Sequence, residues 1–415
     1  TIVHGNALQT DWMTVLPAAR CAYLLGNPPF VGKHYQTKQQ KAELIAVFEG
    51  MKSASDLDYV AAWYLKATRY MAENPTIRTA LVSTNSITQG EQVGLLWPEL
   101  LRRGAKIHFA HRTFSWTNEA RGKAAVHCVI VGFGLFDVAD KTIFDYENVK
   151  GEAHAVAATN INPYLVDGPD VVVGKRQQPL ANVPTMRCGN KPSDGGNLLL
   201  TDSEREALLR EEPAAAPWIK RFLGSEEFIN DISRWCLWLE KIPPETLRKL
   251  PAVLARVEAV RKFRMASSAE PTRRAADTPT RFFYVSQPAT EYILVPEVSS
   301  ERRRYVPIGF MPPDVISSNK NYLIAEPSLF LFGLLQSAMH ISWLGAVGGR
   351  LESRFQYSGT MVYNTFPWPT PTDKQRTSIE TAAQVVLDAR AAHPGASLAD
   401  LYDPLTMPPD LVKAH

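Results

Sequence analysis

The residues best suited to chemistry in this sequence form one tetrapeptide, Asn27-Pro28-Pro29-Phe30. An amine on an aromatic ring is a poor nucleophile, because its lone pair is conjugated with the ring. Two acceptors, the Asn27 side-chain oxygen and the Pro28 carbonyl, could draw such a nitrogen toward tetrahedral geometry and localise that lone pair. The prolines fix φ and would hold both acceptors in place. Phe30 offers a ring face on which a flipped base could stack.

The position of this tetrapeptide favours a catalytic role. It follows the apolar run of residues 21–25, which predicts a strand. Open α/β sheets bind their ligands at the carboxyl ends of the strands. The four residues alone are equally compatible with a proline turn in which Asn is a turn former. The catalytic interpretation therefore depends largely on the predicted strand before them.

The first 150 residues alternate between predicted strands and helices. The strands cover residues 21–25, 79–83, 107–110 and 124–136, and the helices cover residues 38–48, 58–71 and 92–102. This alternation predicts an α/β domain with a mainly parallel sheet and helices on both faces. The last two strands follow one another without a helix, so we expect an antiparallel hairpin at one edge of the sheet.

The pattern changes after about residue 150, where Pro and Gly become frequent. Strands are predicted over residues 282–285, 292–295 and 305–310, and helices over residues 244–263, 328–339 and 374–393. We therefore predict three parts: an α/β domain over residues 1–150, an α+β domain over residues 151–370, and a helical segment over residues 371–415.

Composition excludes several classes of protein. Hydrophobic residues make up 45% and charged residues 21% of the 415 residues, as in ordinary globular proteins. No apolar run approaches the ~20 residues that span a bilayer, and no signal peptide is evident, so we expect a cytoplasmic protein without membrane contact. Cys21 and Cys128 lie in apolar runs and are predicted to be buried free thiols. The spacing of the four cysteines predicts no metal site.

The distribution of charge along the chain suggests a polyanionic partner more strongly than the net charge does. The net charge is only +3, but basic residues gather in residues 261–304, which include Arg302 and Arg303. A solvated helix face followed by a loop would explain this gathering equally well.

A second charged pattern lies near the end of the α+β part, where Arg350, Glu352 and Arg354 alternate with uncharged residues. In an extended strand they would share one face. Arg can read guanine and Glu can accept from cytosine in the major groove of DNA. Contacts to phosphate, or among these side chains, are the alternative.

The tetrapeptide and the order of elements after it resemble motif IV of the γ-type amino-methyltransferases that modify adenine in DNA. The resemblance implies a class I methyltransferase fold, which is Rossmann-like and doubly wound with an antiparallel edge strand. It also implies direct transfer of a methyl group from S-adenosylmethionine to N6 of a flipped adenine. Its catalytic residues would be Asn27, Pro28, Pro29 and Phe30.

Two further sets of residues take their roles from the same resemblance. An aromatic residue near the edge hairpin packs against the flipped adenine in that family; Phe114 matches by order and Trp116 is the reserve candidate. Without the motif, ordinary core packing would explain either ring. Residues 2–8 resemble motif III, so Asn6, with Ala7 beside it, and Asn27 are the predicted contacts of S-adenosylmethionine.

The second half resembles the target-recognition region of fused restriction–modification enzymes of the MmeI kind (type IIL). The segments that carry this resemblance are residues 222–225, 234–239, 349–358 and 363–369. It covers nearly the whole chain and implies double-stranded DNA as the partner. Residues 1–150 would then be a partial methyltransferase domain from motif III onward, and residues 151–370 a target-recognition domain. Arg302, Arg303, Arg350, Glu352 and Arg354 would contact DNA.

The sequence departs from the family in one respect. Methyltransferases of this type hold the donor with a glycine-containing loop after the first strand and an acidic residue after the second. Only 26 residues precede Asn27, and neither element lies among them. We therefore expect a fragment with an incomplete donor site, in which other segments of the same polypeptide supply donor-binding and nuclease functions.

Two other functions remain open at this point. A non-catalytic DNA-binding or specificity module would explain the missing donor loop without truncation. A methyltransferase acting on protein or RNA could also use an Asn-Pro-Pro turn, although the large, basic and aromatic-rich second half argues against a small protein-directed enzyme.

Overall fold

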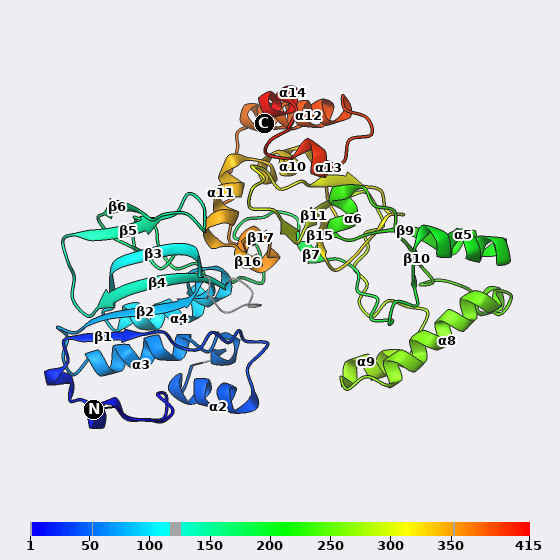
Figure 1. Ribbon diagram of the computed structural model, residues 1–415. Coiled ribbons are helices and arrows are strands. Elements are labelled where there is room, and N and C mark those ends of the chain that lie inside the picture. The colour runs from blue at the N-terminus through cyan, green and yellow to red at the C-terminus, as the bar shows by residue number, and fades with distance from the viewer. Residues whose placement is uncertain (1, 52, 117–125, 352) are drawn as a thin grey trace. The chain divides into compact units, whose positions relative to one another are not determined.

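The computed structural model describes residues 2–51, 53–116, 126–351 and 353–415 (Figure 1). The chain divides into two units. Unit 1 comprises Thr1–Gln177 with Ala346–Ser353, and unit 2 comprises Gln178–Gly345 with Arg354–His415.

Unit 1 is built on a six-stranded sheet in the order β1-β2-β4-β3-β5-β6 (Figure 1). The strands are β1 (Tyr23–Gly26), β2 (Arg78–Thr84), β3 (Lys106–Trp116), β4 (Val126–Gly134), β5 (Lys141–Asp145) and β6 (His154–Ala158). Strands β1 and β2 are parallel, as are β3 and β5, while β4 runs antiparallel to both of its neighbours. The predicted α/β architecture is confirmed.

Two details of the predicted sheet were wrong. The sheet is mixed rather than mainly parallel, because β6 also runs antiparallel to β5. The β3–β4 hairpin lies inside the sheet and not at its edge, because β4 inserts between β2 and β3 while β5 and β6 extend the sheet beyond β3. The local sequence predicts a hairpin but carries no information on which strand lies on its far side.

Helices α3 (Ala61–Met71) and α4 (Gly90–Arg102) cover the same face of this sheet. The Tyr64 hydroxyl of α3 lies 2.6 Å from the Ser83 hydroxyl of β2, and its ring stacks on Phe133 of β4 at 5.5 Å. The ring of Trp97 on α4 packs edge-on against the Tyr64 ring, and the Trp97 indole nitrogen donates to the Ile87 carbonyl. Burying three aromatic rings on one face stabilises the domain core and leaves the carboxyl ends of the strands free for a site.

Two shorter helices lie on either side of the Asn-Pro-Pro-Phe segment in the sequence of unit 1. Helix α1 (Trp12–Val15) precedes β1, and α2 (Lys38–Val47) follows the Asn-Pro-Pro-Phe segment. Helix α2 begins at a capping box in which Thr37 and Gln40 satisfy each other's backbone N–H groups. The capping box fixes where the chain leaves the loop that carries Asn27.

Unit 2 contains two four-stranded sheets, in the orders β14-β9-β10-β8 and β13-β11-β15-β7. Their strands are β7 (Met186–Cys188), β8 (Leu199–Leu200), β9 (Ile219–Leu223), β10 (Trp235–Leu237), β11 (Tyr292–Pro296), β13 (Gly309–Met311), β14 (Ile316–Ser317) and β15 (Asn321–Ile324). A further short strand, β12 (Val298–Ser299), pairs with β17 (Arg354–Gln356).

Helices accompany these sheets, and the predicted α+β composition holds for this unit. They are α5 (Asp202–Glu211), α6 (Ser225–Asn230), α7 (Pro244–Arg248), α8 (Pro251–Met265), α9 (Glu270–Arg274), α10 (Leu329–Leu335), α11 (Ala338–Val347), α12 (Asp373–Ala391), α13 (Leu398–Leu401) and α14 (Pro409–Ala414). Helix α12 matches the amphipathic helix predicted over residues 374–393.

Other predicted elements differ from the structure. The helix predicted over residues 244–263 is broken into α7 and α8, because Leu250 leaves the helical region before Pro251 begins α8. Residues 282–285 form no strand; Tyr284 makes only an isolated bridge with Lys191. Of the strand predicted over residues 305–310, only Gly309 and Phe310 lie in β13.

The predicted burial of Cys21 and Cys128 as free thiols is confirmed, while Cys188 is exposed. Across the residues that the structure describes, no single helix has the length and apolar character to cross a membrane. Only α10 and α11 taken together, which are bent by 52° at their junction, meet that criterion by length and composition.

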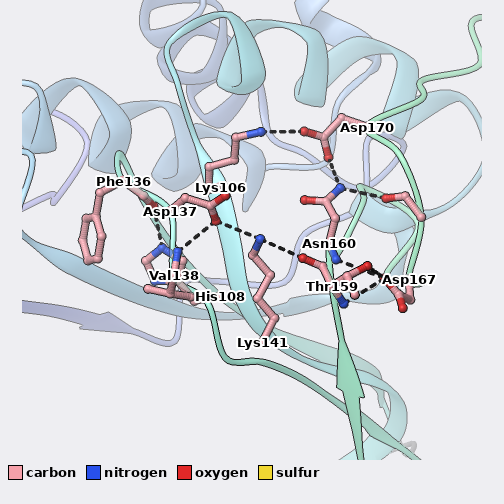
Figure 2. Close-up of polar contacts among 11 residues, drawn as sticks. Lys106, His108, Phe136, Asp137, Val138, Lys141, Thr159, Asn160, Asp167 and Asp170 are labelled. Atoms are coloured by element: carbon pink, nitrogen blue, oxygen red, sulfur yellow. Dashed lines mark hydrogen bonds and ion pairs between the residues drawn. The ribbon is translucent and has the colours of Figure 1, made fainter.

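A polar cluster ties the far end of the unit 1 sheet together (Figure 2). The ammonium of Lys141, whose side chain is almost fully buried, lies 2.8 Å from Asp137 and donates to the Thr159 carbonyl at 3.1 Å. Hydrogen bonding from Lys141 is the main cause that lowers the pKa of Asp137. Nearby, Lys106 pairs with Asp170 at 2.9 Å. These contacts join β3 and β5 to the segments that follow β4 and β6.

Replacing Lys141 by Ala is expected to destabilise unit 1 by about 2–3 kcal/mol, because it removes the donor to the Thr159 carbonyl and opens a gap where the almost fully buried Lys141 side chain packed. Lys141→Met keeps most of the packing and is expected to cost about 1–2 kcal/mol. Urea denaturation measures both. Lys150→Ala, at an exposed position, is the control. A Met variant as stable as the wild type would show that the polar contacts contribute nothing, and equal losses for Ala and Met would show that the packing of the stem contributes nothing.

Candidate active site

A cavity of about 840 Å³ opens at the end of β1. Five residues predicted from the sequence lie on its wall: Asn6, Ala7, Asn27, Pro28 and Pro29. The sequence separates the first two from the others by some twenty residues, so only the fold brings them together. The volume is in the usual range for a small-molecule site.

The carboxyl end of β1 places Asn27 at this cavity. Gly26 is paired with Leu81 of the parallel strand β2, and a Cβ on Gly26 would lie 3.0 Å from the Leu81 side chain. A side chain at position 26 would therefore crowd Leu81, and glycine avoids this contact where β1 approaches β2 just before Asn27. Asn27 is exposed at the cavity, whereas Pro28 is buried and anchors the turn.

The segment after Asn27 is held by residues just before α3. Asp58 accepts from the Lys33 N–H at 2.9 Å, and the Tyr59 N–H donates to the Val31 carbonyl at 3.0 Å. Gln36 adds a bond of 2.9 Å to the Leu57 carbonyl. The loop that carries the predicted catalytic residues is thus fixed at three points.

Asp58 also joins this loop to the end of β2. Its second carboxylate oxygen accepts from the Ser86 hydroxyl at 2.5 Å, and its own N–H donates to Gln92 of α4 at 2.9 Å. The side chain is buried, so both oxygens depend on these partners.

Glu43 of α2, on the cavity wall, is a second buried carboxylate that accepts several hydrogen bonds, as Asp58 does. One carboxylate oxygen accepts from Asn6, Gln9 and Gln39 at 2.9, 3.0 and 2.9 Å, and the other accepts from the Tyr59 hydroxyl. The hydrogen bond from Tyr59 is the main cause that lowers the pKa of Glu43, against the opposing effect of burial.

Neither Glu43 nor Asp58 was predicted from the sequence. One signal was available for Glu43, because it shares the buried face of α2 with Val47, one turn further on. A charged residue on an apolar helix face is buried only when it is paired. No comparable signal marks Asp58, since its partners are distant in the sequence.

The predicted base-stacking residues lie on β3. The Phe114 ring stacks on Tyr146 at 5.5 Å and lies 6.0 Å from Trp116, which is 39% exposed. Among the residues that the structure describes, Phe30, Phe114 and Trp116 are not part of the cavity wall. Their contact with a flipped base therefore remains a prediction.

The DNA-binding candidates occupy different surroundings. Arg302 is exposed, whereas Arg303 is half-buried, and burial lowers its pKa with a partial offset from Asp403. Glu352 lies outside the described residues.

The prediction that Arg350 and Arg354 lie on one continuous strand was wrong. Strand β16 (Gly349–Leu351) ends before β17 begins at Arg354, and Ser353 lies in a turn. Serine is a common turn residue because its side chain bonds to nearby backbone. The alternation of charged residues therefore does not place these two arginines on one face of a continuous strand.

Comparison with known proteins agrees with the fold. Residues 1–145 match the family model described as the MmeI DNA-methyltransferase domain, residues 167–370 the MmeI target recognition domain, and residues 371–415 the MmeI C-terminal domain. DNA methyltransferase A of Bacillus subtilis (strain 168) is 40% identical over 414 residues, which are 99% of this chain and 46% of that protein.

The solved structure of the type IIL restriction–modification enzyme MmeI in complex with DNA is 58% identical, with a TM-score of 0.96. The match covers 100% of this chain and 55% of MmeI, so the chain spans about half the length of the relatives it matches. At this identity the class I methyltransferase fold with an attached recognition domain is confirmed for the described residues. The chain therefore belongs to the MmeI family of restriction–modification DNA methyltransferases.

Proposed function

We propose that this protein methylates N6 of adenine in double-stranded DNA, with S-adenosylmethionine as donor, as part of a type II restriction–modification system. One observation carries the proposal: the acceptors suited to an aromatic amine, on Asn27 and Pro28, share a cavity with Asn6 and Ala7. Membership of the MmeI family supports it.

In this proposal Asn27 and Pro28 accept hydrogen bonds from the amine of a flipped adenine. These bonds localise the nitrogen lone pair, and the stiff proline turn keeps the acceptors in position before the base arrives. Phe30 and Phe114 hold the base between their rings, with Trp116 as the reserve for Phe114. S-adenosylmethionine supplies an electrophilic methyl group when bound, and the transfer needs no covalent enzyme intermediate.

The cavity fits part of such a donor. Its wall carries the aromatic rings of Trp12, Tyr59 and Trp63 beside the Asn6 amide. Rings and a directed amide suit the adenine of the donor, which needs both stacking and edge contacts. Asn6, Ala7 and Asn27 would hold it, and we infer that segments outside this chain hold the remainder.

We assign residues 1–150 to the methyltransferase domain, residues 151–370 to the DNA target-recognition domain and residues 371–415 to a C-terminal helical segment. The cytoplasm is the expected compartment. MmeI was solved in complex with DNA, which supports the same partner here. The proposed contacts are Arg302, Arg303, Arg350, Glu352 and Arg354.

Arginines that contact phosphate and arginines that contact bases are expected to behave differently. Arg302→Ala should reduce the slope of log K against log salt by about one unit, because each phosphate contact releases about one counterion. Arg354→Ala should instead lower the preference for the recognition sequence, by about 1–3 kcal/mol if it reads a base. Titrations of cognate and scrambled duplexes at several salt concentrations test both, and an unchanged slope for Arg302→Ala would remove it from the interface.

The proposed reaction is tested by incubating the intact protein with a DNA library and S-adenosylmethionine, then digesting the DNA to nucleosides. Mass spectrometry should detect N6-methyladenine, and sequencing should place it at one recognition site. Methylated cytosine would overturn the assignment to adenine. DNA binding without any methylation would favour a non-catalytic specificity module.

A further inference from the structure

The side chain of Asn6 is fixed at both ends. Its amide nitrogen donates to Glu43 at 2.9 Å, and its oxygen accepts from the Leu8 N–H at 2.9 Å. An amide whose oxygen and nitrogen have different partners cannot rotate by 180° without losing both bonds. The direction in which Asn6 presents its remaining donor and acceptor capacity is therefore set by Glu43 and Leu8.

Among the residues that the structure describes, Glu43 is the only charged one that lines the cavity. Its four hydrogen-bond donors, on Asn6, Gln9, Gln39 and Tyr59, are all neutral. The bonds come from three separate parts of the chain: the segment before α1, helix α2 itself, and the segment before α3. Together they lower the pKa of Glu43, so the group is an anion that accepts from every partner.

We propose that Glu43 is a positioning residue, which sets the direction of the Asn6 amide and holds the segment of residues 6–9 against α2 so that the donor wall of the cavity is formed in advance. The inference rests on the proposed function in one respect, namely that Asn6 contacts S-adenosylmethionine. Glu43 acts through Asn6 and needs no contact with the donor.

Exchanging the chemical groups of Asn6 and Glu43 separates this positioning role from a merely structural one. Asn6→Asp would place two carboxylates within hydrogen-bond distance of each other, so like charges would repel. Glu43→Gln would remove the anion that selects the nitrogen end of Asn6. Combining Asn6→Asp with Glu43→Gln reverses the pair, because the amide introduced at position 43 can donate to the carboxylate introduced at position 6. The total charge is then the same as in the wild type.

Calorimetric titration of the intact protein with S-adenosylmethionine tests this reversal. Each single variant is expected to weaken binding by roughly 10- to 100-fold, and the double variant to return to within about threefold of the wild type. Glu49→Gln, the same substitution at an exposed position just after α2, is the matched control and should change affinity by less than about threefold. Thermal unfolding checks that all variants are folded.

Hydrogen exchange of the Leu8 amide gives a second readout that does not depend on the donor. Its protection should fall in both single variants and return in the double variant. A double variant no better than the weaker single variant, in affinity and in Leu8 protection, would overturn the inference. A wild-type protein that does not bind S-adenosylmethionine would refute the proposed function instead, and Leu8 protection would then judge the pair by itself.

Discussion

Replacing Asn27 by Ala in the intact protein will lower the rate of adenine methylation by about 10²–10³-fold while DNA affinity stays within about threefold. The side-chain oxygen of Asn27 is one of two acceptors that localise the lone pair of the target amine, so its loss acts on the chemical step. Asn27 is exposed at the cavity and packs little, so the fold should not suffer. Single-turnover methylation with excess enzyme measures the effect on chemistry, and a DNA titration measures affinity.

The control for this experiment is Asn230→Ala, at an exposed position of α6 in unit 2. It should leave the methylation rate within about twofold of the wild type. If Asn27→Ala methylates at the wild-type rate, Asn27 has no catalytic role and the cavity must be reassigned. If the wild-type protein itself binds DNA but never methylates, the chain acts as a specificity module.

Replacing Arg264 by Met is expected to destabilise unit 2 by about 3–5 kcal/mol. Arg264 on α8 is fully buried, and burial lowers its pKa with a partial offset from the charge of Asp194. Its guanidinium donates five hydrogen bonds, all to backbone carbonyls. They run to Ser193 at 3.0 Å, Ala275 at 2.9 Å, Thr278 at 3.1 Å, Pro192 at 2.8 Å and Arg281 at 2.7 Å.

These five bonds hold the chain on both sides of α8 and α9, so the substitution leaves the carbonyls around the buried Arg264 side chain without their donor. Arg264→Lys should be intermediate, because an ammonium has three donors and cannot reproduce the planar fork. Arg261→Ala, at an exposed position of the same helix, should change stability by less than about 0.5 kcal/mol. Urea denaturation gives the overall loss, and hydrogen exchange in α8 locates it. Equal stability of Arg264→Met and wild type would show that surrounding water replaces the guanidinium.

The two buried carboxylates, Asp58 and Glu43, support the segments that form the candidate site. Asp58 and Glu43 do not carry the proposed chemistry, yet they fix the loop after Asn27 and the segment around Asn6. An active site built from loops depends on such support, because loops have few bonds of their own. Substitutions at these two positions should therefore affect ligand binding or catalysis before they affect the overall fold.

The sequence by itself determined the local chemistry and the class of fold. Asn27-Pro28-Pro29 directly after an apolar strand predicted both the acceptors and their place at the end of β1, because alternation of apolar residues and turn chemistry are local properties. The sequence also predicted α12, because the periodicity and the capping box of this helix depend only on residues that are close together in the chain. The MmeI resemblance was also readable, since its segments are spread over nearly the whole chain.

Only the tertiary structure decided which distant residues meet. The insertion of β4 between β2 and β3 depends on strands that are far apart in the sequence. The same is true of the bond from Asn6 to Glu43, the bond from the Lys33 N–H to Asp58, and the bonds from Arg264 to the Pro192 and Ser193 carbonyls. Strand order and buried polar pairing depend on long-range packing, which leaves no periodic pattern in the chain. For this reason the sequence predicted the acceptors of the candidate site, and the fold revealed the residues that hold them in place.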